Sequence, residues 1–371
     1  MSKIDFMSLK AIDFCDDVRD GTHDSPKHLD SGKLLITSKN IKGDSIDFEN
    51  ASYISEEDYN KINERSLVEI NDVLYSMIGT VGLVYRVDQQ PNYAIKNMGL
   101  FKIHDELKSK WLYYYLNSPN AKGKVLSMLS GSTQKFISLS NLRNLEIEFP
   151  QNIDDAKRII KICESIDKKI KLNNKINNNL LELSKQLYLN TFSNTSVFEE
   201  IKLGELCNIK YGKGLPTTQI LDSGYPVYGG NGIIGYYNSK LYDESQVLVS
   251  CRGAASGKVV LSKPNSFVTN NSLILEVDRL YHHYLKEYCL LNPFFAYTTG
   301  SAQPQITINN IKDIIIKIPD ATILEDFNSK CESIEIKYFL NIEQNETLEQ
   351  LRDTLLPKLM NGEINLDNIE I

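Results

Sequence analysis

Gly131-Ser132-Thr133-Gln134, followed by Ile137-Ser138-Leu139-Ser140-Asn141-Leu142 and Phe149-Pro150, has a second copy later in the chain. That copy is Gly300-Ser301-Ala302-Gln303, followed by Ile306-Thr307-Ile308-Asn309-Asn310-Ile311 and Ile318-Pro319, at a constant offset of 169 residues. Beyond the two copies, Cys163-Glu164-Ser165-Ile166 matches Cys331-Glu332-Ser333-Ile334. A repeat of this length indicates a duplicated domain with its helix rather than a solenoid unit. Two similar heads on two similar helices predict a protein that contacts its target at two places.

The composition is that of a soluble globular protein. The chain has 371 residues, of which 42% are hydrophobic and 24% charged, and its length suggests two or three domains. The sequence has no apolar stretch of membrane-spanning length, and Met1-Ser2-Lys3-Ile4-Asp5 does not begin a signal peptide. The six cysteines form no CxxC and the five histidines show no ligand spacing, which predicts reduced thiols, no metal site and a cytoplasmic location.

The net charge of −7 argues at first against nucleic-acid binding. However, residues 321–371 contain four basic and eleven acidic residues, and this segment accounts for the whole net charge. The two heads are therefore close to neutral, and a local basic face on either of them is permitted.

Both heads mix short strands with helices, so the predicted fold class is mixed α/β (α+β). In the first head, alternating apolar residues predict strands over 73–78, 98–103 and 145–149. A helix is predicted over 109–129, interrupted near Pro119. The second head repeats these signals, for example with Val247-Leu248-Val249-Ser250 in place of Val73-Leu74-Tyr75-Ser76.

Each head is followed by a long helical segment with a seven-residue repeat. In 154–192, which contains no Gly or Pro, the repeat is Ile159, Ile166, Asn173, Leu180 and Leu187, with companion positions expected at Ile162, Ile176 and Leu183. In 321–360 the repeat is Phe327, Ile334, Asn341, Leu348 and Leu355. Such stripes with one polar position are typical of coiled coils. We expect the two helices to pair antiparallel, the alternative being that each packs only on its own domain.

The expected domain boundaries follow from these patterns. They are a first head at 1–150, a first helix at 151–194, a second head at 195–320, a second helix at 321–362 and a tail at 363–371.

Four motifs of the second half resemble the specificity (S) subunit of type I restriction-modification enzymes. They occur in the family's order and cover the Gly-rich run Tyr225–Tyr237, the segment Val247–Val259, the segment Gly300–Pro319 and the helix end Leu348–Glu363. Two departures stand out. The first head has Leu34–Gly43 in place of the Gly-rich run, and Asp154-Asp155 and Glu325-Asp326 stand where the family often has Glu-Gln.

The resemblance implies a non-catalytic targeting subunit. Each head would be a target-recognition domain that reads one half of a split, asymmetric double-stranded DNA sequence. The paired helices would set the spacing of the halves and dock two methyltransferase subunits, and restriction (motor) subunits would join for cleavage. The chain itself would bind no cofactor, since S-adenosylmethionine, Mg²⁺ and ATP belong to the partner subunits.

Candidate DNA contacts follow from side-chain chemistry. Arg suits the guanine edge, Asn and Gln suit the adenine edge, and Lys or hydroxyl groups suit phosphates. In the first head the candidates are Arg19, His23, Lys27, Lys39, Lys96, Asn97, Thr133, Gln134 and Lys135. In the second head they are Lys210, Tyr211, Lys213, Tyr228, Asn231, Arg252, Lys258, Asn270, Asn271, Ser301, Gln303 and Gln305.

Two other functions stay open at this stage. The chain could be a methyltransferase or nuclease in its own right. Asn292-Pro293-Phe294-Phe295 resembles an adenine-flipping loop, but it lacks that loop's second Pro and no Gly-rich motif for a methyl-donor cofactor precedes it. The chain could also be a coiled-coil scaffold with protein-binding heads. The pair His282-His283 is interpreted as surface or core packing rather than as a metal site.

Overall fold

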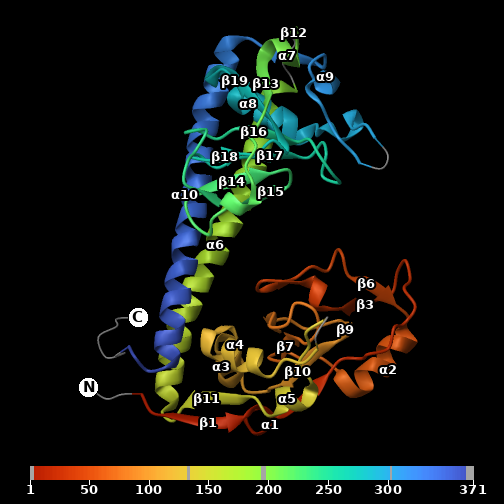
Figure 1. Cartoon of the computed structure of the whole chain (residues 1–371), viewed down its shortest axis with the longest axis vertical. Helices are drawn as coiled ribbons and strands as arrows, with labels where there is room; N and C mark the ends of the chain where they lie inside the picture. The colour runs from red at the N-terminus through yellow and green to blue at the C-terminus, as the bar shows by residue number, and fades with distance from the viewer. Residues whose placement is uncertain (1–3, 132–133, 194–197, 301–302, 365–371) are drawn as a thin grey trace. The chain divides into compact units, whose positions relative to one another are not determined.

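The computed structural model of the chain describes residues 4–131, 134–193, 198–300 and 303–364. It divides into two compact units, the first made of residues 1–171 and 345–371 and the second of residues 172–344. Each unit combines one globular head with one part of each long helix, α6 (Ile153–Phe192) and α10 (Ala321–Met360) (Figure 1). We call residues 4–150 the first head and residues 198–319 the second head.

The main sheet of the first head has four antiparallel strands in the order β2-β10-β7-β8. Their bounds are Asp17–Asp20 (β2), Met98–Lys102 (β10), Val73–Ser76 (β7) and Val84–Arg86 (β8). Every residue of β7 is buried, because both faces of the sheet are covered. Successive side chains of a strand point to opposite faces. Val73 and Tyr75 accordingly join the core that contains helix α3 (Glu106–Asn117), whereas Leu74 joins Leu100 in a second core.

That second core lies against a smaller sheet with the order β6-β3-β9. Strand β3 (Lys33–Ile36) is antiparallel to β6 (Ser52–Ile54) and parallel to β9 (Tyr93–Ile95). The remaining elements of the first head are β1 (Phe6–Lys10), α1 (Ala11–Phe14), η1 (Ser38–Asn40), β4 (Ile41–Lys42), β5 (Ser45–Ile46), α2 (Glu56–Ser66), α4 (Pro119–Ser127), α5 (Leu139–Arg143) and β11 (Glu146–Pro150).

The second head repeats both sheets, which confirms the duplication. Its main sheet has the order β13-β19-β16-β17, and its smaller sheet has the order β15-β14-β18 with β14 and β18 parallel. The elements are β12 (Phe198–Lys202), α7 (Leu203–Leu206), β13 (Cys207–Tyr211), η2 (Thr217–Gln219), β14 (Tyr225–Gly229), β15 (Gly232–Tyr237), β16 (Val247–Ser250), β17 (Val259–Leu261), β18 (Phe267–Val268), β19 (Ser272–Val277), α8 (Arg279–Leu291), η3 (Phe294–Tyr297), α9 (Ile308–Ile311) and β20 (Ile315–Pro319).

The heads differ most in how the central strand of the smaller sheet continues. In the second head, β14 turns directly into β15 through Gly230 and Asn231. In the first head, residues 37–51, which include η1, β4 and β5, separate β3 from β6. The Gly-rich run is therefore a tight hairpin, and the first head has a longer insertion at the same place.

The first and last strands of each head pair as a two-stranded antiparallel ribbon. In the first head Phe6 of β1 lies opposite Pro150 of β11, and in the second head Phe198 of β12 lies opposite Pro319 of β20. Figure 1 shows β1 and β11 side by side. Each head therefore begins and ends at one ribbon, directly before its long helix.

The seven-residue rows of the helices face inward to different degrees. Of the α6 row, Ile159, Ile166 and Asn173 are buried and Leu180 and Leu187 half-buried; of the α10 row, Phe327 and Asn341 are buried and Ile334, Leu348 and Leu355 half-buried. The expected companion row of α6 is wrong, since Leu183 is 48% exposed. The buried companion row lies four residues after the first and consists of Ala156, Cys163, Ile170, Asn177 and Ser184. Its small and polar members gave a weaker apolar signal than Ile162, Ile176 and Leu183.

The two helices pair antiparallel within each unit, as expected. In the first unit Arg352 Nη1 donates to Asp167 Oδ1 at 3.1 Å. In the second unit Asn341 Nδ2 donates to Asn177 Oδ1 at 2.8 Å, and Asn173 Nδ2 donates to Gln344 Oε1 at 2.8 Å. Rising residue numbers on α6 meet falling numbers on α10, which is the signature of an antiparallel pair.

The predicted strands over 73–78, 98–103 and 145–149 are confirmed to within two residues by β7, β10 and β11. The helix expected over 109–129 becomes α3 and α4, which meet at Ser118, and the Ser118 hydroxyl accepts a hydrogen bond from Ala121 N at 3.3 Å. Helix α10 continues through Pro357 to Met360, although Pro357 has no N–H to donate within the helix; its carbonyl oxygen accepts from Asn361 N at 2.9 Å. Among the described residues, no helix has the length and hydropathy needed to cross a membrane.

The asparagine contact between α6 and α10 gives a testable prediction. Asn341→Leu should lower the free energy of unfolding by about 1–3 kcal/mol, because it leaves the buried Asn177 Oδ1 without its donor. The double variant Asn177→Leu/Asn341→Leu should lose less than the sum of the two single variants, with a coupling of about 0.5–3 kcal/mol. Urea unfolding followed by circular dichroism measures all four proteins. Strictly additive losses would contradict the assigned contact.

Candidate nucleic-acid interface

The loop Cys251–Lys258 of the second head joins β16 to β17 and is shaped by two glycines. Gly253 has φ 78° and Gly257 has φ 93°, in the left-handed region that favours glycine. The loop is held by hydrogen bonds from Gly257 N to Ser250 O and from Gly253 N to Pro304 O, both 2.9 Å. With its backbone fixed in this way, the loop exposes the side chains of Arg252 and Lys258.

Three further segments of the second head adjoin this loop. Asn231, in the β14–β15 turn, accepts a hydrogen bond from Lys258 Nζ at 2.6 Å. The turn between β18 and β19 contacts the loop through Cys251 N and Asn271 O, at 3.0 Å. Arg252 also forms a β-bridge with Gln305. We call the resulting group the second-head loop cluster; its members are Lys213, Asn231, Arg252, Lys258, Asn270, Asn271 and Gln305.

Lys213 belongs to this cluster through the backbone. Its carbonyl oxygen accepts from Asn270 N at 3.2 Å, and its N–H donates to Val268 O at 2.9 Å. The preceding Gly212 permits this approach, because a Cβ there would lie 2.3 Å from Thr269 O. The loop cluster thus combines two kinds of groups, amides that suit base edges and cations that suit phosphates or guanine.

Other candidates of the second head lie outside the loop cluster. Lys210 Nζ pairs with Glu276 Oε1 at 2.5 Å and lies over the Tyr242 ring, 5.5 Å from its centre. Burial acts to raise the pKa of Glu276, but the hydrogen bond from Lys210 lowers it, and the net shift is downward, so both groups of the pair are charged at neutral pH. Tyr228 is only 4% exposed, and its hydroxyl accepts from Lys263 N at 2.9 Å. Tyr211 and Gln303 are exposed, and Ser301 lies outside the described residues.

In the first head, three candidates come together around His23. Its Nδ1 lies 2.8 Å from Asn97 Oδ1, and its Nε2 lies 2.9 Å from Asp20 Oδ2. Lys96, the neighbour of Asn97, donates from Nζ to Ser25 Oγ at 2.7 Å. His23 also lines a cavity of about 540 Å³ together with Arg65 of α2. The structure therefore places His23, Lys96 and Asn97 in one group of polar side chains.

Arg19 is engaged within the protein. Its Nε donates to Asp17 Oδ2 at 2.6 Å and its Nη1 to Arg65 O at 3.1 Å. The hydrogen bond from Arg19 lowers the pKa of Asp17, so this pair is charged at neutral pH. Lys27 and Lys39 are exposed, and Lys39 lies in η1, within the insertion of residues 37–51.

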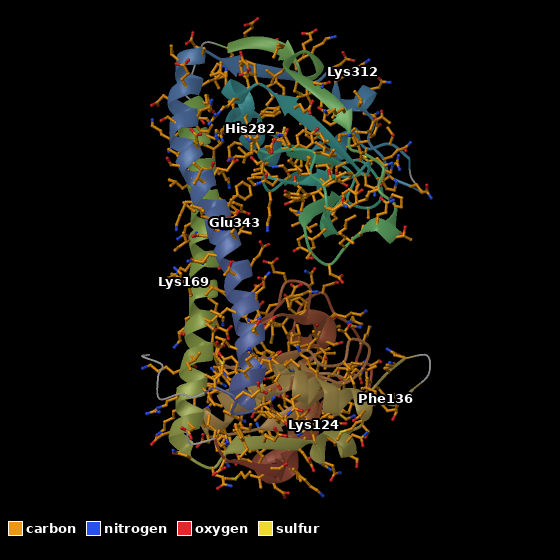
Figure 2. The ribbon with its side chains drawn as sticks, turned by 60° about the vertical axis from the view of Figure 1, so that its left-hand side comes forward. Lys124, Phe136, Lys169, His282, Lys312 and Glu343 are labelled. Atoms are coloured by element: carbon orange, nitrogen blue, oxygen red, sulfur yellow. The ribbon has the colours of Figure 1, made fainter. Side chains whose placement is uncertain are left out.

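Gln134 and Lys135 are exposed beside the β7–β8 loop, and Thr133 lies outside the described residues. The contact is made by a β-bridge between Ile78 and Phe136, which corresponds to the bridge between Arg252 and Gln305 in the second head. Figure 2 labels Phe136. The β7–β8 loop also has two glycines with positive φ, Gly79 at 77° and Gly82 at 101°. It is therefore the first head's counterpart of the Cys251–Lys258 loop.

Two features of the first head were missed from the sequence. The β7–β8 loop could have been found, because Gly79 follows Ser76 at the same distance as Gly253 follows Ser250. Arg65, which pairs with Asp20 and lines the His23 cavity, had no such signal. It reaches the cavity only because α2 packs beside β3 and β9.

The chain has two heads of one fold. Each head presents loops with amide and cationic side chains, and each packs on a pair of coiled-coil helices. These features define a duplicated DNA-recognition protein. Comparison with known proteins makes this specific. The chain belongs to the family described as type I restriction modification DNA specificity domain, whose profile matches residues 24–182 and again residues 196–344. The resemblance seen in the sequence is thereby confirmed.

Individual relatives agree with this family. The chain is 24% identical to the type I restriction enzyme MjaIX specificity subunit of Methanocaldococcus jannaschii, over 85% of this chain and 84% of that protein. It is 27% identical to the EcoprrI specificity subunit of Escherichia coli, over 36% of each chain. The fold is similar to that of the crystallised type I S subunit from M. genitalium, with a TM-score of 0.59, 18% identity and 97% of both chains covered.

The two glycines of the Cys251–Lys258 loop give a matched test of its geometry. Gly253→Ala should lower the free energy of unfolding by about 1–2 kcal/mol, the cost of a left-handed residue with a Cβ in open space. Gly257→Ala should cost about 1–3 kcal/mol more, because its Cβ would lie 2.6 Å from Phe295 N. Urea unfolding compares the two variants directly, and equal losses would show that the close backbone packing at Gly257 is misplaced.

Proposed function

We propose that this chain is the non-catalytic specificity subunit of a type I restriction-modification complex, with each head reading one half of a split, asymmetric DNA target. The observation that carries the proposal is the match of the family profile to both repeats, 24–182 and 196–344. The two sheets and the terminal ribbon recur in both heads, so both heads would approach DNA with corresponding loops.

The two half-sites should differ in sequence, because the loops proposed to contact DNA differ. The second-head loop cluster offers Arg252 and Lys258 beside the amides of Asn231 and Gln305. The corresponding loop of the first head, Gly79–Gly82, contains no charged residue and has Gln134 and Lys135 beside it, while His23, Lys96 and Asn97 form a separate polar group of that head. A half-site contacted by Arg and amides should be read differently from one contacted by His, Lys and Asn.

The paired helices are proposed to set the spacing between the half-sites and to dock two methyltransferase subunits, with restriction (motor) subunits joining for cleavage. In this arrangement S-adenosylmethionine, Mg²⁺ and ATP bind to the partner subunits, and the complex acts in the cytoplasm. Support comes from the M. jannaschii and E. coli relatives, which are named as specificity subunits of type I restriction enzymes.

The decisive experiment expresses the chain with its cognate methyltransferase subunit and maps methylated adenines across the genome. A split motif with two unlike halves is expected, and it should disappear when only the methyltransferase is expressed. The purified chain alone, incubated with DNA, Mg²⁺ and labelled methyl donor, should neither methylate nor cleave. Methylation or cleavage by the chain alone would replace the proposal with an enzymatic function.

A single variant tests whether Arg252 reads a base. If the Arg252 guanidinium contacts a base edge, Arg252→Ala in the complex should relax specificity at one position, at a cost of about 1–3 kcal/mol. Binding to duplexes changed one base pair at a time measures this. Lys312→Ala removes an equal charge from an exposed residue beside α9 (Figure 2) and serves as the control. An equal loss on all sequences for Arg252→Ala would identify a phosphate contact instead.

A further inference from the structure

The second unit contains a cavity of about 330 Å³ between the second head and α10. Its polar lining includes His282 and His283 from α8, Glu335 and Glu343 from α10, and Ser245; His282 and Glu343 are labelled in Figure 2. Among the described residues, none of the second-head loop cluster lines this cavity. The cavity is therefore separate from the surface proposed to contact DNA.

Helix α8 is fixed against the long helices, and this brings the polar residues together. Tyr284 and Leu285, which directly follow the two histidines, are 3% and 0% exposed in the core of the second unit. The Tyr284 ring packs edge-on against Phe192 of α6, with 4.9 Å between ring centres, and Phe192 packs on Phe327 of α10. The residues before Tyr284 consequently face the side of α10 that carries Glu335.

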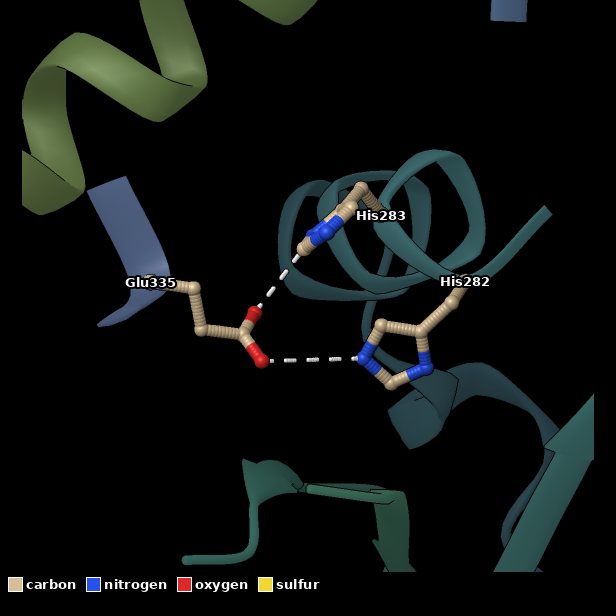
Figure 3. A group of neighbouring side chains, drawn as sticks. All are labelled: His282, His283 and Glu335. Atoms are coloured by element: carbon tan, nitrogen blue, oxygen red, sulfur yellow. Dashed lines mark ion pairs between the residues drawn. The ribbon is translucent and has the colours of Figure 1, made fainter. Parts of the chain in front are cut away.

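Three potential metal ligands converge at this point (Figure 3). His283 Nδ1 lies 3.4 Å from Glu335 Oε2, His282 Nε2 lies 3.9 Å from Glu335 Oε1, and the three ligand atoms all lie within 4.8 Å of one another. Around a tetrahedral ion with bonds of about 2.0–2.1 Å, neighbouring ligand atoms are about 3.3–3.4 Å apart. The separation of 3.4 Å between His283 and Glu335 is therefore that of two ligands of a bound ion, and rotation of the His282 side chain would shorten its longer separation.

The hydrogen bonding of the group leaves room for a ligand. His283 has a side chain only 12% exposed, and its buried Nδ1 makes no hydrogen bond of normal geometry. The Ser245 hydroxyl lies between the other two groups, 2.5 Å from Glu335 Oε1 and 3.3 Å from His282 Nε2. A buried nitrogen without a partner is costly in a folded protein unless something else satisfies it.

Glu335 also contacts a buried lysine of α8, in addition to the two histidines. Lys286 Nζ lies 3.1 Å from Glu335 Oε2 and 3.4 Å from Glu287 Oε1, so the lysine pairs with both carboxylates. A carboxylate that binds a metal through one oxygen commonly accepts a hydrogen bond at the other, and Lys286 can fill that role.

We propose that His282, His283 and Glu335 bind one divalent transition-metal ion of the zinc type, with a fourth position open to the cavity. Two imidazoles and one carboxylate suit Zn²⁺, Co²⁺ or Ni²⁺ rather than Mg²⁺ or Ca²⁺, which prefer oxygen ligands. The ion would join α8 of the second head to α10. The expectation of no metal site rested on spacing along the chain, and the third ligand, Glu335, lies 52 residues after His283 in sequence.

The first unit supplies an internal comparison. The helices α3 and α8 correspond through their capping residues Asp105 and Asp278, so Ser109 and Lys110 stand in place of His282 and His283. Lys110 forms ion pairs with Glu106 and Glu164, both at 2.8 Å. The first unit thus fills the equivalent position with a lysine, and metal binding is proposed for the second unit alone.

The test uses the full chain, purified with reduced thiols and stripped of metal by a chelator. Titration with Zn²⁺ followed by calorimetry should show one ion per chain, and Co²⁺ should give the visible absorption of a tetrahedral nitrogen and oxygen site without a thiolate band. His283→Ala and Glu335→Gln should each weaken binding at least tenfold. His104→Ala should leave binding unchanged, because His104 pairs with one carboxylate, Asp16, in the first unit.

A second variant guards against loss of folding. His282→Ser/His283→Lys introduces the residues that stand at the equivalent place in the first unit, and circular dichroism confirms that it folds. Zn²⁺ should raise the melting temperature of the natural chain and leave that of this variant unchanged. The proposal fails if the natural chain binds no stoichiometric Zn²⁺, or if the folded double variant binds it equally well.

Discussion

The structure depends on one constraint: the long helices bury their inner faces in the same cores that hold the heads together. In the first unit a single core contains Ile159 and Cys163 of α6, Leu359 of α10, and Trp111 and Phe149 of the first head. In the second unit Phe192 and Phe327 share a core with Tyr284. Each large apolar side chain removed from water contributes about 1.5–3 kcal/mol. A head therefore cannot turn on the helical segments of its own unit without exposing its own core to water.

Polar contacts between each head and the helical segments of its own unit then fix the orientation of the head, which the apolar core alone does not determine. In the first unit the Tyr114 hydroxyl donates to Asp167 at 2.8 Å, and Arg352 binds the other oxygen of that carboxylate at 3.1 Å. The second unit uses different residues for the same purpose, with Lys286 bound to Glu335 and Ser184 donating to Glu287. The repeats thus share their sheets and ribbons but differ in the contacts that join head to helix. The two copies therefore share one scaffold and differ in the polar residues that join each head to its helices.

The extent to which the sequence predicts this structure depends on how local each signal is. The long helices were predicted within a residue or two, because a seven-residue repeat without Gly or Pro is a strong local pattern. The buried companion row of α6 was not predicted, because its members Cys163 and Asn177 are less apolar than Ile162 and Ile176. Arg252 and Gln305 could be proposed individually as DNA contacts, but the bridge between them could not, because it joins residues distant in sequence. Tyr228 shows the reverse case, a polar side chain that packing has buried.

The terminal ribbons have a consequence for how such proteins diversify. Because Phe6 lies opposite Pro150 and Phe198 opposite Pro319, the chain enters and leaves each head at neighbouring points. The residues between those two points can therefore be replaced without changing where the backbone on either side of the head runs. Genetic recombination with break points in the ribbon strands would insert a foreign head while preserving the helix that follows. Each head can therefore be exchanged as a unit, and a new DNA target can be acquired in one recombination event rather than by gradual substitution.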